Sequence, residues 1–275
     1  MPFSKIVFLS FIFWQFICLT PPGHAAFDHI GIGAEPLALG NAMVASRLNT
    51  YAIYYNPANI SYNRKPLIEF GYRSFFGLPS LDQTNLVINY PIGSVPFSFC
   101  CINLGNKIYR EINLAVGSSC TCLEKVSIGI CLNLFYLDIT GYAHHLSSGI
   151  NIGFSYLLND QITTGVLITN LNQPKFSILN EKLPQLFTLG WCYSPSKKIS
   201  FYYELFRDVK YEQDFRAGVT VTCTPELLLR LGVENDSNTY SMGLGLVLNK
   251  IKGNYAALFH PALGLSHVTG IQILL

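Results

Sequence analysis

The stretch SGINIGFSY, residues 148–156, decides the fold of this chain. Its apolar residues Ile150, Ile152, Phe154 and Tyr156 alternate with glycine, asparagine and serine. Because successive side chains of a β-strand point to opposite faces, this stretch has one apolar face and one small, polar face. The same period of two recurs, in segments of about ten residues, from residue 66 to the end of the chain.

The small, polar face carries few charges. Only 12% of the 275 residues are charged, against roughly 25% in an ordinary soluble domain. Half are hydrophobic, and the mean hydropathy is +0.32. A soluble β-sandwich is the alternative, but its outer face would carry many charged residues. Apolar faces with aromatic ends favour a membrane barrel, which must close on itself to pair every backbone group. The aromatic ends are Tyr72, Tyr90, Tyr136, Tyr156 and Tyr193.

About fourteen such segments can be counted, so the predicted fold is all-β: a closed antiparallel transmembrane β-barrel over residues 66–275. An even number of strands returns both termini to the periplasmic side, with short turns there and longer loops outside. The longest predicted outer loop is 170–184. The predicted strands are 66–75, 83–90, 96–104, 110–118, 124–137, 145–157, 161–170, 185–194, 197–206, 213–223, 226–234, 238–247, 253–260 and 264–275.

Residues 1–26 have the layout of a secretory signal peptide. Lys5 precedes an apolar core, Pro21-Pro22-Gly23 ends it, and small residues allow cleavage after Ala25 or Ala26. A single N-terminal membrane anchor is the alternative. Together with the barrel pattern, this leader predicts export to the outer membrane of a Gram-negative envelope, where the partner is outer-membrane lipid.

Cysteine and charge give no sign of a cofactor. Seven cysteines remain after Cys18 is removed with the leader, and their spacings match no zinc site. Cys120 and Cys122 are close enough to pair, although one intervening residue strains such a bond. The net charge of +2 lacks the basic stripe of a nucleic-acid binder. We therefore expect no metal, no cofactor and no nucleic-acid partner.

Six charged residues fall on the face predicted to point into the lumen. A charge facing lipid at mid-bilayer costs about 2–4 kcal/mol for Arg or Lys, which independently favours the inward side. Their mixed signs favour ion pairs that hold a luminal segment to the wall; substrate binding is the alternative. These residues are Glu69, Arg73, Glu204, Arg216, Arg230 and Glu234.

Catalytic candidates are few. His144 and His145 lie near Ser147 and Ser148, as a nucleophile and its base would, but no carboxylate that completes such a site can be identified. We therefore predict no catalytic residue and no enzymatic activity, and a barrel phospholipase or acyltransferase is the alternative.

Residues 27–65 do not alternate and are rich in small residues, which suits a hatch folded into the barrel lumen; a periplasmic tail is the alternative. Their pattern resembles the N-terminal signature of the FadL-like outer-membrane superfamily, which includes the PorV/PorQ proteins. The resemblance rests on Gly33, Ala38, Leu39, Gly40 and Ala42, then on Ala52, Asn56, Pro57, Ala58 and Ile60. Near the end, Leu263, Gly264 and His267 resemble the closing strand of PorV-like members.

The resemblance implies a fourteen-stranded barrel with an N-terminal hatch that contains the Asn-Pro-Ala turn. In fatty-acid transporters of this superfamily, hydrophobic ligands pass through the barrel and can leave through its wall. The expected function is therefore transport or binding of hydrophobic small molecules or exported cargo. A PorV/PorQ-like accessory that presents a secreted protein is the alternative. The expected partners are a hydrophobic small molecule or a secreted protein.

Overall fold

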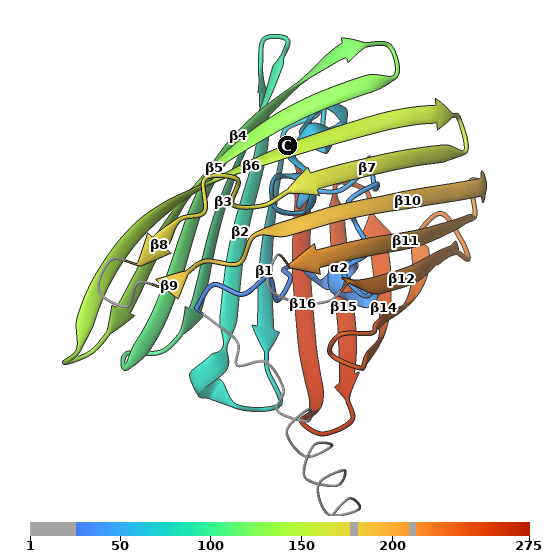
Figure 1. Ribbon diagram of the computed structural model, residues 1–275. Helices are drawn as coiled ribbons and strands as arrows, with labels where there is room; N and C mark the ends of the chain where they lie inside the picture. The colour runs from blue at the N-terminus through green and yellow to red at the C-terminus, as the bar shows by residue number, and fades with distance from the viewer. Residues whose placement is uncertain (1–25, 177–180, 209–212) are drawn as a thin grey trace, which may run out of the picture.

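The computed structural model describes residues 26–176, 181–208 and 213–275, so the predicted leader lies outside it except for Ala26. Within these residues, fourteen strands form one closed barrel (Figure 1). They are β1 (Leu67–Ser74), β2 (Gln83–Ile92), β3 (Val95–Gly105), β4 (Tyr109–Leu123), β5 (Val126–Ile139), β6 (Ala143–Asn159), β7 (Ile162–Ile168), β10 (Leu186–Ser196), β11 (Ile199–Asp208), β12 (Gln213–Thr222), β13 (Leu227–Glu234), β14 (Thr239–Leu248), β15 (Ile251–His260) and β16 (Gly264–Leu274).

Every neighbouring pair in the barrel is antiparallel, and β1 pairs with β16 to close it. The predicted fold class is thereby confirmed. One difference is a small sheet of β8 (Lys175–Phe176) and β9 (Glu181–Lys182) in the predicted outer loop.

No helix among the described residues has the length and hydropathy to cross a bilayer.

The two faces of the wall differ as the period of two requires. Leu132 and Leu231 point outward and are 56% and 58% exposed. Gly129 and Asn133, on the other face of β5, are buried against the interior. An outer surface of large apolar side chains is what a lipid environment selects, because it leaves no polar group unsolvated.

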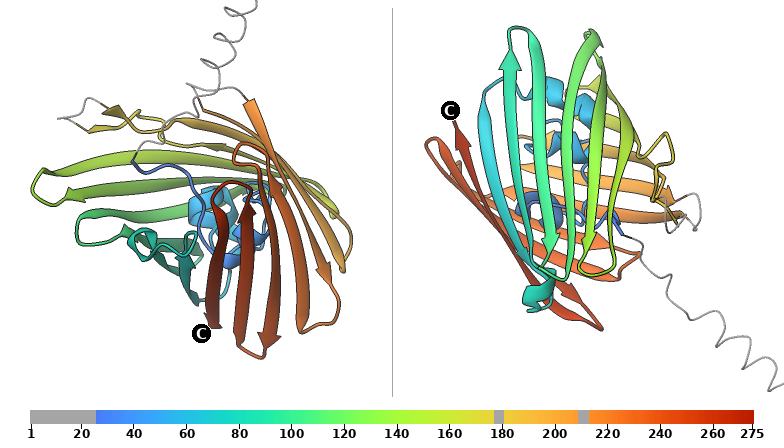
Figure 2. Two further views of the ribbon diagram at one scale, coloured as in Figure 1. Left: turned by 90° about the horizontal axis from the view of Figure 1, so that it is seen from below. Right: turned by 90° about the vertical axis from the view of Figure 1, so that its left-hand side faces the viewer.

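The hatch, residues 27–65, lies inside the barrel (Figures 1 and 2). It contains α2 (Ala34–Ala38), α3 (Ala52–Tyr55) and the 3-10 helix η1 (Pro57–Tyr62); a second 3-10 helix, η2 (Pro79–Leu81), joins β1 to β2. Hatch residues such as Ile32, Leu39 and Ile60 form the main apolar core with Val87 and Cys100 of the wall. The core of the protein is therefore the contact between hatch and barrel.

The hatch runs from one mouth of the barrel to the other. Ala26 and Phe27 pack against the same apolar cluster as Tyr109 and Ile139. The latter two face each other across β4 and β5 beside the turns at 106–108 and 140–142, and we call this end the loop mouth. The barrel itself begins and ends where Leu67 pairs with Leu274, at the closing mouth. The expectation that both termini lie on one side therefore needs correction, because the hatch crosses the lumen before β1 begins.

A seam in the wall lies between β6 and β7. β7 pairs with β6 only from Ile152 to Asn159, so the rest of β6 toward the loop mouth has no strand of the barrel on that side. The connection between β7 and β10 covers it: Leu171 N–H donates to Ile150 O at 2.8 Å, and the Asn172 side chain bonds Ile150 N at 3.0 Å and Ser148 O at 2.8 Å. Side-chain amides thus replace a strand ladder along this edge.

Candidate functional site

The Asn-Pro-Ala turn fixes the hatch against the wall. Asn56 is fully buried, and its Oδ1 accepts the Ala58 N–H at 3.0 Å, which starts η1. Its Nδ2 donates to Val44 O at 2.7 Å and to Phe154 O of β6 at 3.0 Å. One amide therefore caps a helix, ties two hatch segments together and holds them to the barrel.

Glycines on the inner face let the hatch approach the wall closely. A Cβ added at Gly153 would lie 2.0 Å from Asn56 Oδ1, and one at Gly129 would lie 2.3 Å from Pro57 O. On the opposite wall, a Cβ at Gly232 would lie 2.2 Å from Gly40 N. These distances leave no room for any side chain, so the inner face is glycine where the hatch backbone passes.

A buried charge cluster joins the hatch to β11, β12 and β13. Arg216 lies 2.7 Å from Glu234 and 3.5 Å from Glu204. The hatch adds two donors: Asn41 Nδ2 to Glu234 at 3.1 Å, and Val44 N–H to Glu204 at 3.1 Å. The two carboxylates are thus shared between an arginine of the wall and polar groups of the hatch.

A second charge cluster holds α2. Glu35 lies 3.1 Å from Arg230 and forms a closer ion pair with Lys252. Burial alone would raise the pKa of Glu35, but the Lys252 ammonium and the Arg230 guanidinium lower it to about 2. Glu35 is therefore ionised at neutral pH and pins α2 to β13 and β15.

The two remaining predicted luminal charges lie on β1. Arg73 is buried, stacks over Phe75 at 3.7 Å, and donates from Nη1 to Ile30 O of the hatch at 2.8 Å. Glu69 is 1% exposed. The structure thus buries five of the six charges expected to face the lumen, and the sixth, Glu234, keeps 12% of its side chain exposed.

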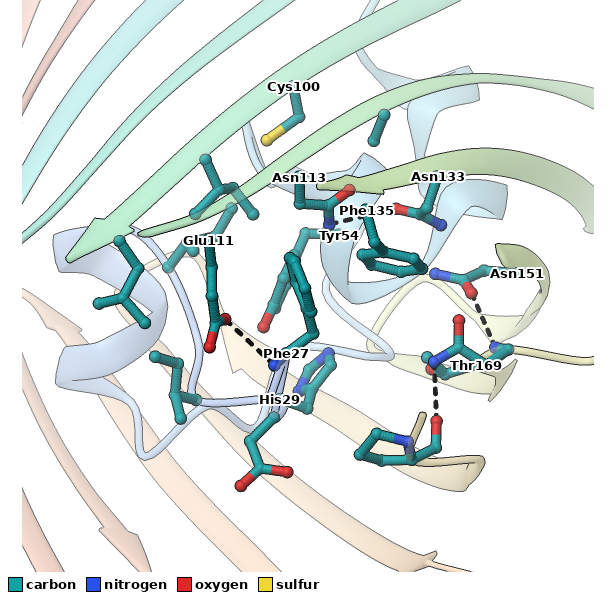
Figure 3. A pocket seen from close by; sticks show the side chains of 18 of the residues that line it. Phe27, His29, Tyr54, Cys100, Glu111, Asn113, Asn133, Phe135, Asn151 and Thr169 are labelled. Atoms are coloured by element: carbon teal, nitrogen blue, oxygen red, sulfur yellow. Dashed lines mark hydrogen bonds between the residues drawn. The ribbon is translucent and has the colours of Figure 1, made fainter. Parts of the chain in front are cut away.

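A cavity of about 70 Å³ lies between the first hatch residues and the wall at the loop mouth (Figure 3). Phe27, Ile30 and Ile32 form its hatch side. Apolar wall residues face them, among them Ile102, Phe135 and Leu186. Apolar residues therefore face each other across the cavity, and polar side chains such as Glu111, Asn113 and Asn133 also line it.

Some polar groups of this cavity are bonded within the protein, whereas Gln83 Oε1, Asn113 Oδ1 and Thr169 Oγ1 are buried without a hydrogen-bond partner. Glu111 Oε2 accepts the Phe27 N–H at 3.1 Å, and Asn151 Oδ1 accepts the Asn170 N–H at 2.9 Å (Figure 3). Burial, and to a lesser degree the charge of Arg216, lower the pKa of His29 to about 3. Its ring is therefore neutral and stacks on Tyr54 at 4.4 Å. Such a lining offers a guest both apolar contact and a few unpaired hydrogen-bonding atoms.

A second cavity, of about 400 Å³, lies on the other side of the hatch. It is more polar, with Arg47, Arg64, Asp160 and Tyr202 in its lining. The hatch separates the two cavities and is held by the ion pairs to β11–β13 and β15, whereas the loop-mouth cavity lies against β2–β7 and β10. The charged anchors and the apolar cavity thus occupy different sides of the lumen.

The other predicted residues lie apart from this cavity. Gly33 and Gly40 take positive φ, while Leu39, Ala42, Pro57 and Ala58 are buried in the hatch. Leu263 is exposed, Gly264 begins β16, and His267 bonds Tyr255 Oη through Nδ1 at 2.7 Å.

His144 pairs with Asp138 at 2.9 Å, and Ser147 Oγ donates to Lys175 O. The seven described cysteines are free thiols, with Cys120 Sγ 3.3 Å from Cys122 Sγ. The described residues contain no cluster of metal ligands.

The sequence did not single out Glu35 and Lys252, nor Phe135 of the cavity and Leu137, which is buried in the same cluster. A signal for the last two was present, because both fall on the inner face of β5 and interrupt its small, polar pattern. The partner of Glu35 could not be found from spacing, since Lys252 lies far along the chain on another strand.

No protein-family profile matches this sequence, and no curated protein matches it. Solved structures do match in fold. The Ralstonia pickettii toluene transporter TbuX has a TM-score of 0.70 at 10% identity, covering 90% of this chain and 100% of that one. The monoaromatic hydrocarbon channel CymD gives 0.71 at 12% identity, with 90% and 98% covered. A Pseudomonas aeruginosa FadL homologue gives 0.59 at 12%, with 86% and 96% covered. The chain therefore has the fold of the FadL-like outer-membrane barrels.

Proposed function

We propose that this protein is an outer-membrane channel for small, uncharged hydrophobic molecules. The observation that carries the proposal is the apolar cavity at the loop mouth, between Ile30, Ile32 and the wall residue Phe135. The fold adds support, because matching barrels are described as a toluene transporter and a monoaromatic hydrocarbon channel. By the usual arrangement of such barrels, the loop mouth faces the outside and the closing mouth faces the periplasm.

A guest must displace the first hatch residues before it can enter fully. The cavity is about 70 Å³, while an engineered apolar cavity that binds benzene measures about 150 Å³. On its wall side, the cavity is bounded by strands that backbone hydrogen bonds hold in the barrel. On its hatch side, it is bounded by the irregular segment 27–32. Phe27 is bonded to Glu111 of the wall, and Ile30 is bonded to Arg73. We infer that its movement enlarges the cavity.

The seam beside β6 offers this cavity a way out through the wall. Asn151, Thr169 and Asn170 line the cavity and also belong to the seam. Side-chain bonds from a loop can open one at a time, while a strand ladder opens only cooperatively. A hydrophobic guest would leave here for the membrane and avoid the polar cavity beyond the hatch.

An uptake experiment tests the proposal. The protein, and a Phe135→Trp variant that fills the cavity, would be expressed in a Gram-negative host without hydrocarbon channels of its own. We expect radiolabelled toluene to enter faster with the wild type than with Phe135→Trp. Phe187→Trp is the matched control, since Phe187 is 48% exposed on the outer face. Equal uptake by wild type, Phe135→Trp and empty host would refute a channel role.

The secretion-accessory alternative gains no support from the comparisons, in which the matching barrels are transporters and channels. Those barrels are not enzymes by description, and Ser147 bonds a backbone carbonyl of the β7–β10 connection. Hydrolysis of phospholipid by the purified barrel would overturn the non-enzymatic assignment.

A further inference from the structure

The amino end of the hatch is held by a carboxylate of the barrel wall. The Phe27 backbone nitrogen donates to Glu111 Oε2 at 3.1 Å, and the Tyr109 hydroxyl binds the other oxygen of the same carboxylate. The Phe27 ring meets Phe135 edge-on, with centroids 5.0 Å apart. A backbone nitrogen and its side chain are therefore both seated in the loop-mouth cavity.

The backbone of Phe27 is strained for a residue inside a chain. Its φ is +60°, in the left-handed region that bulky residues rarely adopt. Part of this restriction comes from the carbonyl of the preceding residue, against which the rest of the residue is crowded. A residue with no predecessor has no such carbonyl, so the conformation suits the first residue of a chain.

The sequence places a leader cleavage site at this point. Gly23, Ala25 and Ala26 supply the small residues that leader peptidases require. Cleavage after Ala26 would turn the Phe27 nitrogen itself into the terminal ammonium. Cleavage after Ala25 would place that ammonium one residue away, about 3.8 Å along the chain. Either product brings a positive charge into ion-pair range of Glu111.

We propose that the α-ammonium of the processed chain pairs with Glu111 inside the loop-mouth cavity, so that leader removal completes the seat of residues 27–32. The ion pair replaces the neutral backbone N–H donor by a cation, so that both partners of the hydrogen bond to the Glu111 carboxylate carry a charge. Asp28 adds a second carboxylate that interacts with Glu111, so a cation there relieves repulsion between the two. This proposal does not depend on what the barrel transports.

The path of the chain sets the order of events. Ala26 lies at the loop mouth, on the opposite side of the hatch from the closing mouth. A leader held on the periplasmic side would keep Ala26 away from the loop mouth, so the proposal requires cleavage to precede the seating of the hatch.

The experiment uses full-length protein, expressed with its leader and purified from outer membranes in detergent. Mass spectrometry identifies the first residue, and a limiting amount of an amine-reactive reagent at pH 7.5 measures how fast the α-amine is labelled relative to the lysines. Only the neutral amine reacts, and an adjacent carboxylate raises the pKa of an amine by a unit or more. We expect a first residue of Ala26 or Phe27, and labelling roughly tenfold slower in the folded protein than after denaturation.

Glu111→Gln keeps the hydrogen bond but removes the charge, and we expect it to speed labelling of the α-amine roughly tenfold. Glu226→Gln, in an exposed turn, is the matched control and should change nothing. If Glu111→Gln does not fold, Glu111→Asp keeps the charge and should label nearly as slowly as wild type. A retained leader, a first residue beyond Phe27, or equal labelling of folded and denatured wild type would overturn the proposal.

Discussion

Arg216 Nε lies 2.7 Å from Glu234 Oε1, and the same carboxylate accepts two bonds from Asn41 of the hatch. Arg216 is 5% exposed, so its charge has little water to solvate it. The pair thus does more than join two strands of the wall, because the hatch completes it. Loss of either side leaves a buried charge without full compensation.

Arg216→Met should destabilise the barrel by about 3–5 kcal/mol, since it leaves Glu204 and Glu234 facing each other without their shared cation. Thermal unfolding in detergent, followed by circular dichroism, measures the change. Lys198→Met, in an exposed turn, is the control and should shift stability by less than about 0.5 kcal/mol. A similar effect of both substitutions would contradict the role assigned to the cluster.

Gly153→Ala should dislodge the Asn-Pro-Ala turn, because the new Cβ would overlap Asn56 Oδ1. Overpacking of this kind costs about 1–3 kcal/mol, and hydrogen exchange should report it at residues 56–60. Gly253→Ala is a matched control on β15, where no atom lies within 4 Å of the added carbon. Its stability should stay unchanged or rise, since alanine costs less backbone entropy than glycine. Equal exchange at residues 56–60 in both variants would count against close packing at Gly153.

Acid should loosen the first hatch residues through His29. Burial holds its folded pKa at about 3, against 6.5 for the free side chain. Between these values the unfolded segment binds a proton that the folded segment does not, so its stability is full above pH 6.5 and declines as the pH falls toward 3. From pH 6.5 to 4.5 the loss is about 2–3 kcal/mol.

Limited proteolysis of the His29 segment between pH 7.5 and 4.5 measures this loss. His29→Phe keeps an aromatic ring against Tyr54 but cannot titrate. Its cleavage rate, corrected for protease activity at each pH, should therefore stay flat. If wild type and His29→Phe respond alike, another group carries the pH dependence.

The outer face should reject charge most strongly at its centre. Leu244 lies mid-strand on β14, and Leu248 ends the same strand. Leu244→Arg should cost about 2–4 kcal/mol in lipid vesicles, while Leu248→Arg should cost at most about 1 kcal/mol, because the bilayer is most apolar at its midplane. Unfolding by urea in vesicles compares them. Equal costs would mean that this face does not lie across a bilayer.

The period of two was enough to predict the barrel. Residues 148–156 show why. A strand with large apolar residues on one side and glycine on the other is stable with its apolar side toward lipid and its glycine side toward the lumen. The inward direction of Glu204, Arg216 and Arg230 followed from the same parity. The local sequence pattern therefore predicts the wall of this protein almost completely.

Contacts between the hatch and the wall could not be predicted in the same way. Glu35 meets Lys252 only because α2 packs near the start of β15, a choice made by three-dimensional fit and not by local sequence. The seam at Ile150 was hidden for a similar reason, since β6 itself alternates normally and only its neighbour is short. The cavity lies between the hatch and the wall beside this seam, so the sequence alone could not predict it.

The passage of residues 27–65 from one mouth to the other constrains biogenesis. β16 is the last strand of the chain, so its pairing with β1 closes the barrel last. A segment that contains α2 and η1 could not be threaded through a barrel that has already closed. The hatch, which is synthesised before the strands, must therefore be enclosed as the sheet closes around it. A bulky folded domain fused ahead of Ala26 should therefore block assembly of the barrel. The same domain fused after Leu275 should be tolerated.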